Sequence, residues 1–286
     1  MSATPEQPNI YISQIPYLLP DRAMNAAYDI REKFGLASIG VEIVPLRFHS
    51  EKYLLARKQE TDVDVAVAGV TTATYKDFAK DLRDFRTNPR VFLEVLKIIG
   101  GIGAQSEPLW TRMFRTHLQL AVGLGASYLA MHEEPTRLLQ EHGQLEQWLL
   151  TDVLYGRKLG WGPADNRPEI LSWNIHAIHE FIDVWHKKGY KNLVSILPTD
   201  TVLRNGQFSL GEAFEVLQPK VIQVGDYNPD GKIEKLAPGD GKYARELADL
   251  IRQSSRSNPG TIYTIEVGNA VDVSRSVRFV LDNWKG

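Results

Sequence analysis

Short apolar runs alternate along the chain with longer amphipathic stretches. The apolar runs carry few polar positions on either face, which is typical of strands in a parallel sheet that is covered on both sides. They are IYISQI (10–15), IGVEIV (39–44), VDVAVAGV (63–70), SYLAM (127–131), NLVSIL (192–197), VIQVG (221–225) and IYTIEV (262–267). The amphipathic stretches that predict helices are 21–34, 107–124, 168–188 and 241–253. This alternation predicts βα units around a parallel sheet.

A closed barrel of this type needs eight strands, one more than the pattern shows. The gap between residues 132 and 192 spans about sixty residues, roughly twice the length of one βα unit. We therefore expect a hidden strand near GRKLGWGPADNRPE (156–169). The chain contains no linker, repeat or low-complexity tract that would divide it. We predict a flexible N-terminus over 1–9 and one α/β domain, a (β/α)8 TIM barrel, over 10–286.

Composition narrows the class of protein further. With 286 residues, 43% hydrophobic and 24% charged, the chain matches an ordinary globular domain of barrel size. A formal charge of −2 gives no general attraction to nucleic acid or anionic membranes. The absence of cysteine excludes disulfides and thiolate metal sites. There is no secretory signal pattern and no apolar run of about 20 residues, so we expect a cytoplasmic protein without nucleic-acid or membrane partners.

Polar side chains stand where several of the predicted strands end, the side on which barrel enzymes keep their reactive groups. They are His132, Glu133 and Glu134 after SYLAM, Asp200 after NLVSILPT, Gln223 and Asp226 around the end of VIQVG, and Glu266 within IYTIEV. A carboxylate such as Glu266 in a buried strand is costly unless it is paired or metal-bound. With Asp200 and Gln223 it would form an all-oxygen set suited to Mg²⁺ or Mn²⁺. The alternative is that Glu266 pairs with a neighbouring Lys or Arg in the barrel.

The C-terminal third carries a recognisable series of motifs. Q-V-G-D-Y (223–227), then A-P-G-D-G (237–241), a predicted helix and Y-T-I-E-V (263–267) resemble the xylose isomerase-like TIM barrels. That group includes sugar epimerases, inosose dehydratase and hydroxypyruvate isomerase-like proteins. P-T-D-T (198–201) resembles the Asp-Thr at the end of the group's sixth strand. The resemblance is clear over 190–286 and general before that.

The resemblance implies a metal-assisted isomerase or epimerase that moves a proton between adjacent carbons of a small sugar, polyol or keto-acid. Asp200, Gln223 and Glu266 would be three of four ligands to a divalent metal, Mn²⁺ or Mg²⁺, and Glu266 would also move the proton. Barrels of this kind often pair, so a homodimer is a further expectation. The residues expected to bind the substrate are His132, Glu133, Asp226 and Trp161.

Two departures from the group keep other functions open. The group's fifth strand ends in Glu-Pro-x-Asn, whereas P-A-D-N-R (163–167) places Pro163 where that glutamate should stand. Many members also carry a histidine at the position of Leu203. The residues that could replace the missing glutamate are Asp165, Glu169, Glu133 and Glu134. Without it, the alternatives are a lyase or dehydratase that uses one base, or a non-catalytic barrel that binds a sugar-like ligand.

Two further sets of polar residues have both a functional and a structural explanation. Glu42 lies within a predicted strand that often lines the pocket in this group, but it could equally pair with Arg47 or Lys52. Three histidines, His176, His179 and His186, fall within one predicted helix. Histidines spaced three apart can hold a metal, although a water-facing helix explains them as well.

Overall fold

The structure of the chain is a computed structural model that describes residues 7–44, 50–68, 117–131, 158–161, 168–189, 191–228 and 235–284. Over 158–161 and 168–174 it describes the backbone alone. Parts of the predicted pattern, including most of the helix expected over 107–124, lie outside these ranges.

Eight parallel strands form a closed barrel in chain order, with β8 paired to β1. They are β1 (Asn9–Ser13), β2 (Gly40–Ile43), β3 (Asp64–Ala68), β4 (Tyr128–Met131), β5 (Lys158–Trp161), β6 (Leu193–Pro198), β7 (Val221–Val224) and β8 (Ile262–Ile265). The predicted TIM-barrel fold is confirmed. The strand expected near 156–169 is β5, which pairs with β4 and β6.

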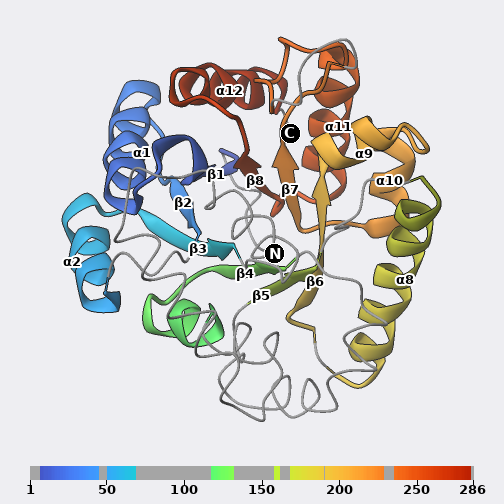
Figure 1. Ribbon diagram of the computed structural model, residues 1–286, viewed down its shortest axis with the longest axis horizontal. Helices are drawn as coiled ribbons and strands as arrows, with labels where there is room; N and C mark the ends of the chain where they lie inside the picture. The colour runs from blue at the N-terminus through green and yellow to red at the C-terminus, as the bar shows by residue number, and fades with distance from the viewer. Residues whose placement is uncertain are drawn as a thin grey trace, which may run out of the picture.

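Helices surround the barrel (Figure 1). The described ones are α1 (Pro20–Phe34), α2 (Glu51–Thr61), α8 (Pro168–Lys187), α9 (Thr199–Asn205), α10 (Leu210–Leu217), α11 (Ala244–Ser257) and α12 (Ala270–Asn283), with a 3-10 turn, η1 (Ile15–Tyr17). Residues 117–123 are also helical, which agrees with the described end of the predicted helix 107–124. In the described part of the chain, no helix is long and apolar enough to cross a bilayer.

Local sequence signals set the ends of several helices. A capping box starts α10, because Ser209 Oγ accepts from the Glu212 N–H and the Glu212 carboxylate accepts from the Ser209 N–H. Asn269 caps α12 through the Val271 N–H. Gly35 ends α1 with a φ of 62°, a left-handed conformation that favours glycine. α11 begins at Ala244, later than the predicted 241, since the preceding residues belong to a loop tied to β7.

Two apolar clusters build the core. The larger one lies between the strands and the helices, as expected for strands buried on both faces. The smaller one fills the inside of the barrel with residues from several strands: Tyr11, Ala66, Tyr128, Ala130, Ile196, Val221 and Ile262. The rings of Tyr11 and Tyr128 meet edge to face, with centroids 5.4 Å apart. Gly40 is required beside Tyr11, because a Cβ there would overlap the tyrosine ring.

The connection after β7 returns to the mouth of the barrel. Asp226 and Leu236 form a bridge of two backbone hydrogen bonds, 2.9 and 3.2 Å long. The Gly268 N–H, just beyond β8, donates to the Lys235 carbonyl at 2.8 Å. Lys235 is therefore fixed between the carboxyl ends of β7 and β8, beside the positions of Gln223 and Glu266.

Candidate functional site

Glu266 is the first residue of the site. It directly follows β8, and its N–H donates to the Val224 carbonyl at 3.0 Å, which continues the strand pairing by one residue. Its side chain is 10% exposed. The carboxylate thus lies at the carboxyl end of the barrel, as the sequence predicted, in a position that needs a partner.

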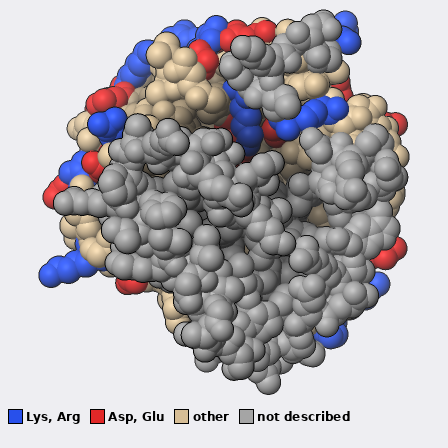
Figure 2. Space-filling view, in the orientation of Figure 1, with Lys and Arg blue, Asp and Glu red and all other residues tan. Residues whose placement is uncertain are grey.

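That partner is Lys235. Its ammonium donates to Glu266 Oε2 in an ion pair, and it lies 4.0 Å from Asp200 Oδ2. Of the two explanations for Glu266, the lysine pair is the one observed. Figure 2 shows basic and acidic side chains next to one another in a depression, where Figure 1 places the tips of β7 and β8. The Lys235 side chain is 33% exposed, so this cation remains in contact with solvent.

Arg204 completes a row of alternating charges. Asp200 lies in the first turn of α9, directly after β6, and its Oδ2 accepts from Arg204 Nη2 at 3.3 Å one helical turn later. The Arg204 guanidinium also lies 5.7 Å from the centre of the Tyr227 ring. The row runs Glu266, Lys235, Asp200, Arg204, and the two carboxylates and two cations balance in charge. We call these four residues the ion cluster.

The ion cluster holds Lys235 in its charged form. Burial lowers the pKa of Lys235, but the negative charges of Glu266 and Asp200 raise it by more. The pKa therefore lies above its ordinary value. Lys235 is a fixed ammonium and not a neutral amine that could attack a carbonyl carbon.

A second polar layer lies beneath the ion cluster, inside the barrel. Tyr128 donates its hydroxyl to Glu42 Oε2 at 2.9 Å and contacts Thr264 Oγ1 at 2.7 Å, across strands that are not neighbours. Gln223 also hydrogen-bonds the Glu42 carboxyl. Glu42 thus points into the barrel, in agreement with the functional explanation of the sequence. Arg47, one of its alternative partners, lies outside the described residues.

Burial is the main cause that perturbs Glu42. It raises the pKa of this carboxyl, and the nearby negative charge of Glu266 adds to the effect. The hydrogen bond from Tyr128 and the positive charge of Lys235 act in the opposite direction. The pKa of Glu42 therefore lies above its ordinary value, whereas Glu266, in the layer above, is held in an ion pair with Lys235.

Thr199 joins the start of α9 to the end of β7 by hydrogen bonds. Its hydroxyl donates to the Gly225 carbonyl at 2.7 Å and accepts from the Gly225 N–H at 2.9 Å. The start of α9 is therefore bound to the end of β7, which sets Asp200 beside Gln223 and Glu266. The three residues expected as metal ligands come from neighbouring positions at the barrel mouth.

These three residues do not form a donor set that fits a divalent ion. Asp200 and Glu266 are each paired with a cationic side chain, and Gln223 is hydrogen-bonded to Glu42. A divalent ion between them would stand against Lys235 and Arg204, which carry charge of the same sign. Within the described ranges, no group of three His, Cys, Asp or Glu side chains is placed to hold a metal. The expectation of Mn²⁺ or Mg²⁺ therefore gains no support from the arrangement of these side chains.

Asp226 serves the loop that follows β7. Its Oδ2 accepts from the N–H groups of Gly239 (3.1 Å) and Gly241 (3.0 Å), and its Oδ1 accepts from Tyr227 (2.7 Å) and Tyr243 (3.3 Å). A Cβ on Gly241 would overlap the Asp226 carboxylate. This explains the P-G-D-G sequence as a loop wrapped around one carboxylate. The expectation that Asp226 binds substrate stays a prediction, and the site is built without it.

Of the remaining residues expected to bind substrate, the structure describes Trp161 alone, and only its backbone. His132 and Glu133 directly follow β4 but lie outside the described residues, as do Glu134, Pro163 and Asp165. Trp161 is the last residue of β5, and its backbone ends at the barrel mouth. No feature of the sequence pointed to Lys235, Arg204 or Tyr128. The one available signal was the buried charge of Glu266, which requires a cation without saying which.

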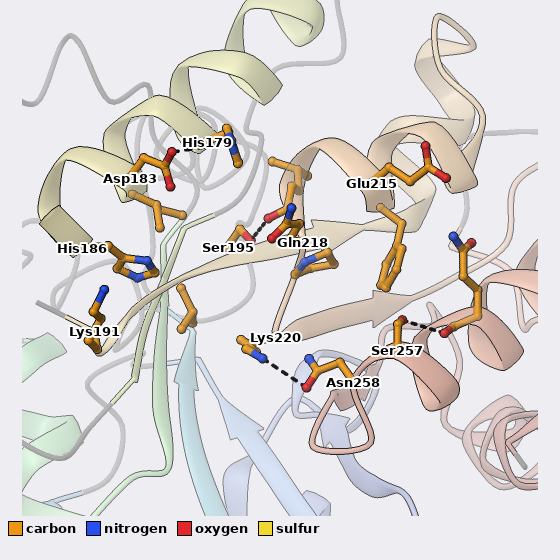
Figure 3. Close-up of a pocket in the computed structure, with 16 residues that line it drawn as sticks. His179, Asp183, His186, Lys191, Ser195, Glu215, Gln218, Lys220, Ser257 and Asn258 are labelled. Carbon is orange, nitrogen blue, oxygen red and sulfur yellow. Dashed lines mark hydrogen bonds and ion pairs between the residues drawn. The ribbon is translucent and has the colours of Figure 1, made fainter. Parts of the chain in front are cut away.

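A cavity of about 540 Å³ lies at the opposite end of the barrel (Figure 3). It is bounded by α8, α10, α11 and the amino ends of β6 and β7. Several of its polar groups have partners: His186 Nε2 contacts the Leu193 carbonyl at 2.7 Å, and Lys220 donates to Asn258 at 3.1 Å. His179 lies 3.8 Å from Asp183 on the same helix. Because reactive groups of TIM barrels sit at the carboxyl ends of the strands, we place the functional site at the ion cluster.

No protein-family model matches the sequence, and no curated protein matches it. Solved structures do. D-allulose 3-epimerase from Methylomonas sp., in complex with D-allulose, has a TM-score of 0.57 at 11% identity over 99% of this chain and 92% of that chain. An AP endonuclease of family 2 from Brucella melitensis has a TM-score of 0.62 at 11% identity over 97% and 100%.

A xylose isomerase-like TIM barrel protein from Mycobacterium smegmatis, in complex with magnesium, has a TM-score of 0.56 at 10% identity and covers 99% of this chain and 98% of that chain. At these identities the likeness concerns the fold. The chain has the fold of the xylose isomerase-like TIM barrel proteins, as the resemblance of residues 190–286 predicted.

Proposed function

We propose that the chain is an isomerase or epimerase that moves a proton between adjacent carbons of a small sugar, polyol or keto-acid. The observation that carries this proposal is the Glu266 carboxylate at the carboxyl end of the barrel, held there by Lys235, whose side chain is 33% exposed. The likeness of the fold to a D-allulose 3-epimerase supports the same class of reaction.

Glu266 is the group that takes up the proton in this proposal. In the ion pair it is a carboxylate, the form that accepts a proton from a carbon next to a carbonyl. Lys235 holds the carboxylate in one orientation and keeps N–H groups near the oxygen on which negative charge develops. These two roles need only side chains that the ion cluster brings together, and no step is routed through a metal.

The walls of the substrate pocket are the second part of the proposal. Trp161 ends β5 at the carboxyl end of the barrel, the end at which Glu266 stands. An aromatic ring at this end would cover the apolar face of a sugar. His132 and Glu133 directly follow β4 in the sequence. They stay predictions as substrate-binding residues. The expected homodimer stays a prediction.

The likeness to an AP endonuclease raises nucleic acid as another substrate class. Phosphate backbones are bound by clusters of Lys and Arg, and this chain has a formal charge of −2. In the ion cluster, both cations are matched by carboxylates. A small neutral or weakly charged substrate therefore fits this site better.

A lyase or dehydratase on the same barrel is the second candidate, and one observation favours it. Two-base epimerisation needs two carboxylates that reach the substrate, but Glu42 is only 1% exposed beneath the ion cluster. Glu266 alone would suffice if it removes the proton from one carbon and then returns it to the hydroxyl on the adjacent carbon, which leaves as water while the double bond forms. The product separates the two candidates, because a dehydratase changes the mass of its substrate and an isomerase does not.

The test is deuterium exchange in D₂O with a panel of small ketoses, aldoses, polyols and 2-keto-acids, followed by NMR and mass spectrometry. We expect wild type to introduce deuterium at one carbon, and Glu266→Gln to lower that rate by about 10²–10⁴-fold, the usual contribution of a positioned general base. Glu215→Gln is the matched control, since Glu215 lies on α10 at the opposite end of the barrel.

Three results would overturn the proposal. Equal exchange by wild type and Glu266→Gln would assign the proton to another group. Loss of one water from the substrate would establish the dehydratase instead. Melting shifts with a sugar but no exchange and no turnover would establish a barrel that binds without catalysis.

A further inference from the structure

We propose that the ammonium of Lys235 replaces the divalent cation for which Asp200, Gln223 and Glu266 would otherwise be ligands, so that the barrel mouth carries a cation built into the chain. The inference concerns what occupies the site and does not depend on the reaction.

The backbone holds Lys235 at this place from both sides. The residue after it is bridged to Asp226 by two hydrogen bonds, and its own carbonyl accepts from the Gly268 N–H. Asp226 is in turn bound to four N–H groups of the surrounding loop. Backbone hydrogen bonds at Leu236 and at its own carbonyl therefore hold Lys235 at the barrel mouth, and its position does not depend on the ion pair alone.

The ammonium contacts the same carboxylates that a metal would need. It donates to Glu266 Oε2 and lies 4.0 Å from Asp200 Oδ2. Arg204 binds the same Asp200 oxygen from the other side at 3.3 Å. Since two cations already balance two carboxylates, the net charge that would attract a divalent ion is absent from the cluster.

Gln223, the one amide among the three expected metal ligands, also has a partner. Gln223 is hydrogen-bonded to Glu42 in the layer below. The Glu42 carboxyl in turn accepts a hydrogen bond from the Tyr128 hydroxyl at 2.9 Å, so its partners lie inside the barrel. Every side chain of the expected donor set thus has a partner within the protein.

An ammonium and a divalent ion act differently on a ligand. Lys235 carries a single charge and directed N–H groups, and one third of its side chain is exposed. It can donate hydrogen bonds to a hydroxyl, carbonyl or carboxylate oxygen of an incoming molecule. It holds such oxygens by hydrogen bonds and not by the coordination bonds of a divalent ion.

The test is direct binding of Mn²⁺, followed by the EPR signal of the free ion, with four proteins: wild type, Lys235→Met, Lys235→Met with Glu266→Gln, and Lys191→Met. Lys235→Met removes the ammonium and keeps a side chain of similar length. Lys191→Met is the matched control, because this exposed lysine lies near the opposite end of the barrel.

We expect wild type and Lys191→Met to bind no Mn²⁺ at millimolar concentration. Lys235→Met should bind about one equivalent at least tenfold more tightly than wild type, and the added Glu266→Gln should abolish that gain. The proposal is overturned if wild type binds one equivalent that Glu266→Gln removes, or if folded Lys235→Met gains no affinity. If Lys235→Met fails to fold, Mn²⁺ titrations of wild type and of the single variant Glu266→Gln are compared. Binding of one equivalent by wild type that Glu266→Gln removes would again overturn the proposal.

Discussion

At the scale of single residues, Glu266 shows how far a sequence can define a site. A carboxylate beside a buried strand had to be neutralised by a metal or by a basic side chain, and the structure contains the second arrangement. The identity of the partner could not be predicted. Lys235 lies 31 positions away in a loop, and its position depends on backbone bridges to Asp226 and Gly268 that leave no periodic signal.

His117 is a buried residue of a different kind, and it predicts a pH dependence of stability. It is 2% exposed, and burial lowers the pKa of its imidazole to about 4. Above pH 6.5 the folded and unfolded states both carry neutral imidazole. Between pH 6.5 and pH 4 the unfolded state binds a proton that the folded state does not, so stability falls as the pH falls.

We expect His117→Leu to remove this component of the acid sensitivity. Between pH 7 and pH 4, the free energy of unfolding of wild type should fall by on the order of 3 kcal/mol more than that of the variant. Urea denaturation at pH 7, 5.5 and 4 measures the difference. His179→Leu, which alters a half-exposed histidine on α8, should keep the wild-type dependence. Parallel pH profiles for wild type and His117→Leu would refute the assignment.

At the scale of elements, the loop between β7 and α11 is organised around one side chain. Asp226 accepts four N–H groups, and the loop approaches it so closely that glycine is required at position 241. The sequence P-G-D-G predicted a turn in this place, but it did not reveal that the turn encloses a carboxylate. The expectation that α11 starts at 241 failed for the same reason, since these residues are bound to Asp226.

A matched pair of glycine substitutions tests this organisation. Gly241→Ala should lower the free energy of unfolding by about 1–3 kcal/mol, because its Cβ overlaps the Asp226 carboxylate. Gly211→Ala, within α10, should raise it by about 0.5–1 kcal/mol, since a Cβ there meets only ordinary contacts and alanine favours helix. Chemical denaturation gives both values. A stable Gly241→Ala protein would mean that the loop is not packed against Asp226.

At the scale of the whole molecule, most of the barrel could be predicted because its strands are buried on both faces and therefore apolar throughout. β5 escaped the pattern since KLGW combines a lysine and a glycine in four residues. Only the count of strands required by a closed barrel indicated where it lies. The site was predictable in part for a related reason: carboxyl ends of parallel strands converge, so Asp200, Gln223 and Glu266 had to lie near one another.

Closure of the barrel also predicts how the molecule unfolds. β1 pairs with both β2 and β8, so residues from the two ends of the described chain belong to one ring of strands. We expect one cooperative transition, with the same midpoint by tryptophan fluorescence and by far-ultraviolet circular dichroism. Two separate midpoints would show that the segment 10–286 does not unfold as one domain.

The ion pair of Lys235 and Glu266 has a consequence for how the site is supplied. The positive charge of a side chain is made with the protein, in one copy per molecule. Dialysis or a chelator cannot remove it, another ion cannot replace it, and its presence does not depend on the metal concentration of the surroundings. If Lys235 takes the place of a divalent ion, as we propose, the barrel needs no ion from its surroundings to complete this site. The positive charge available to a ligand is then that of protein side chains.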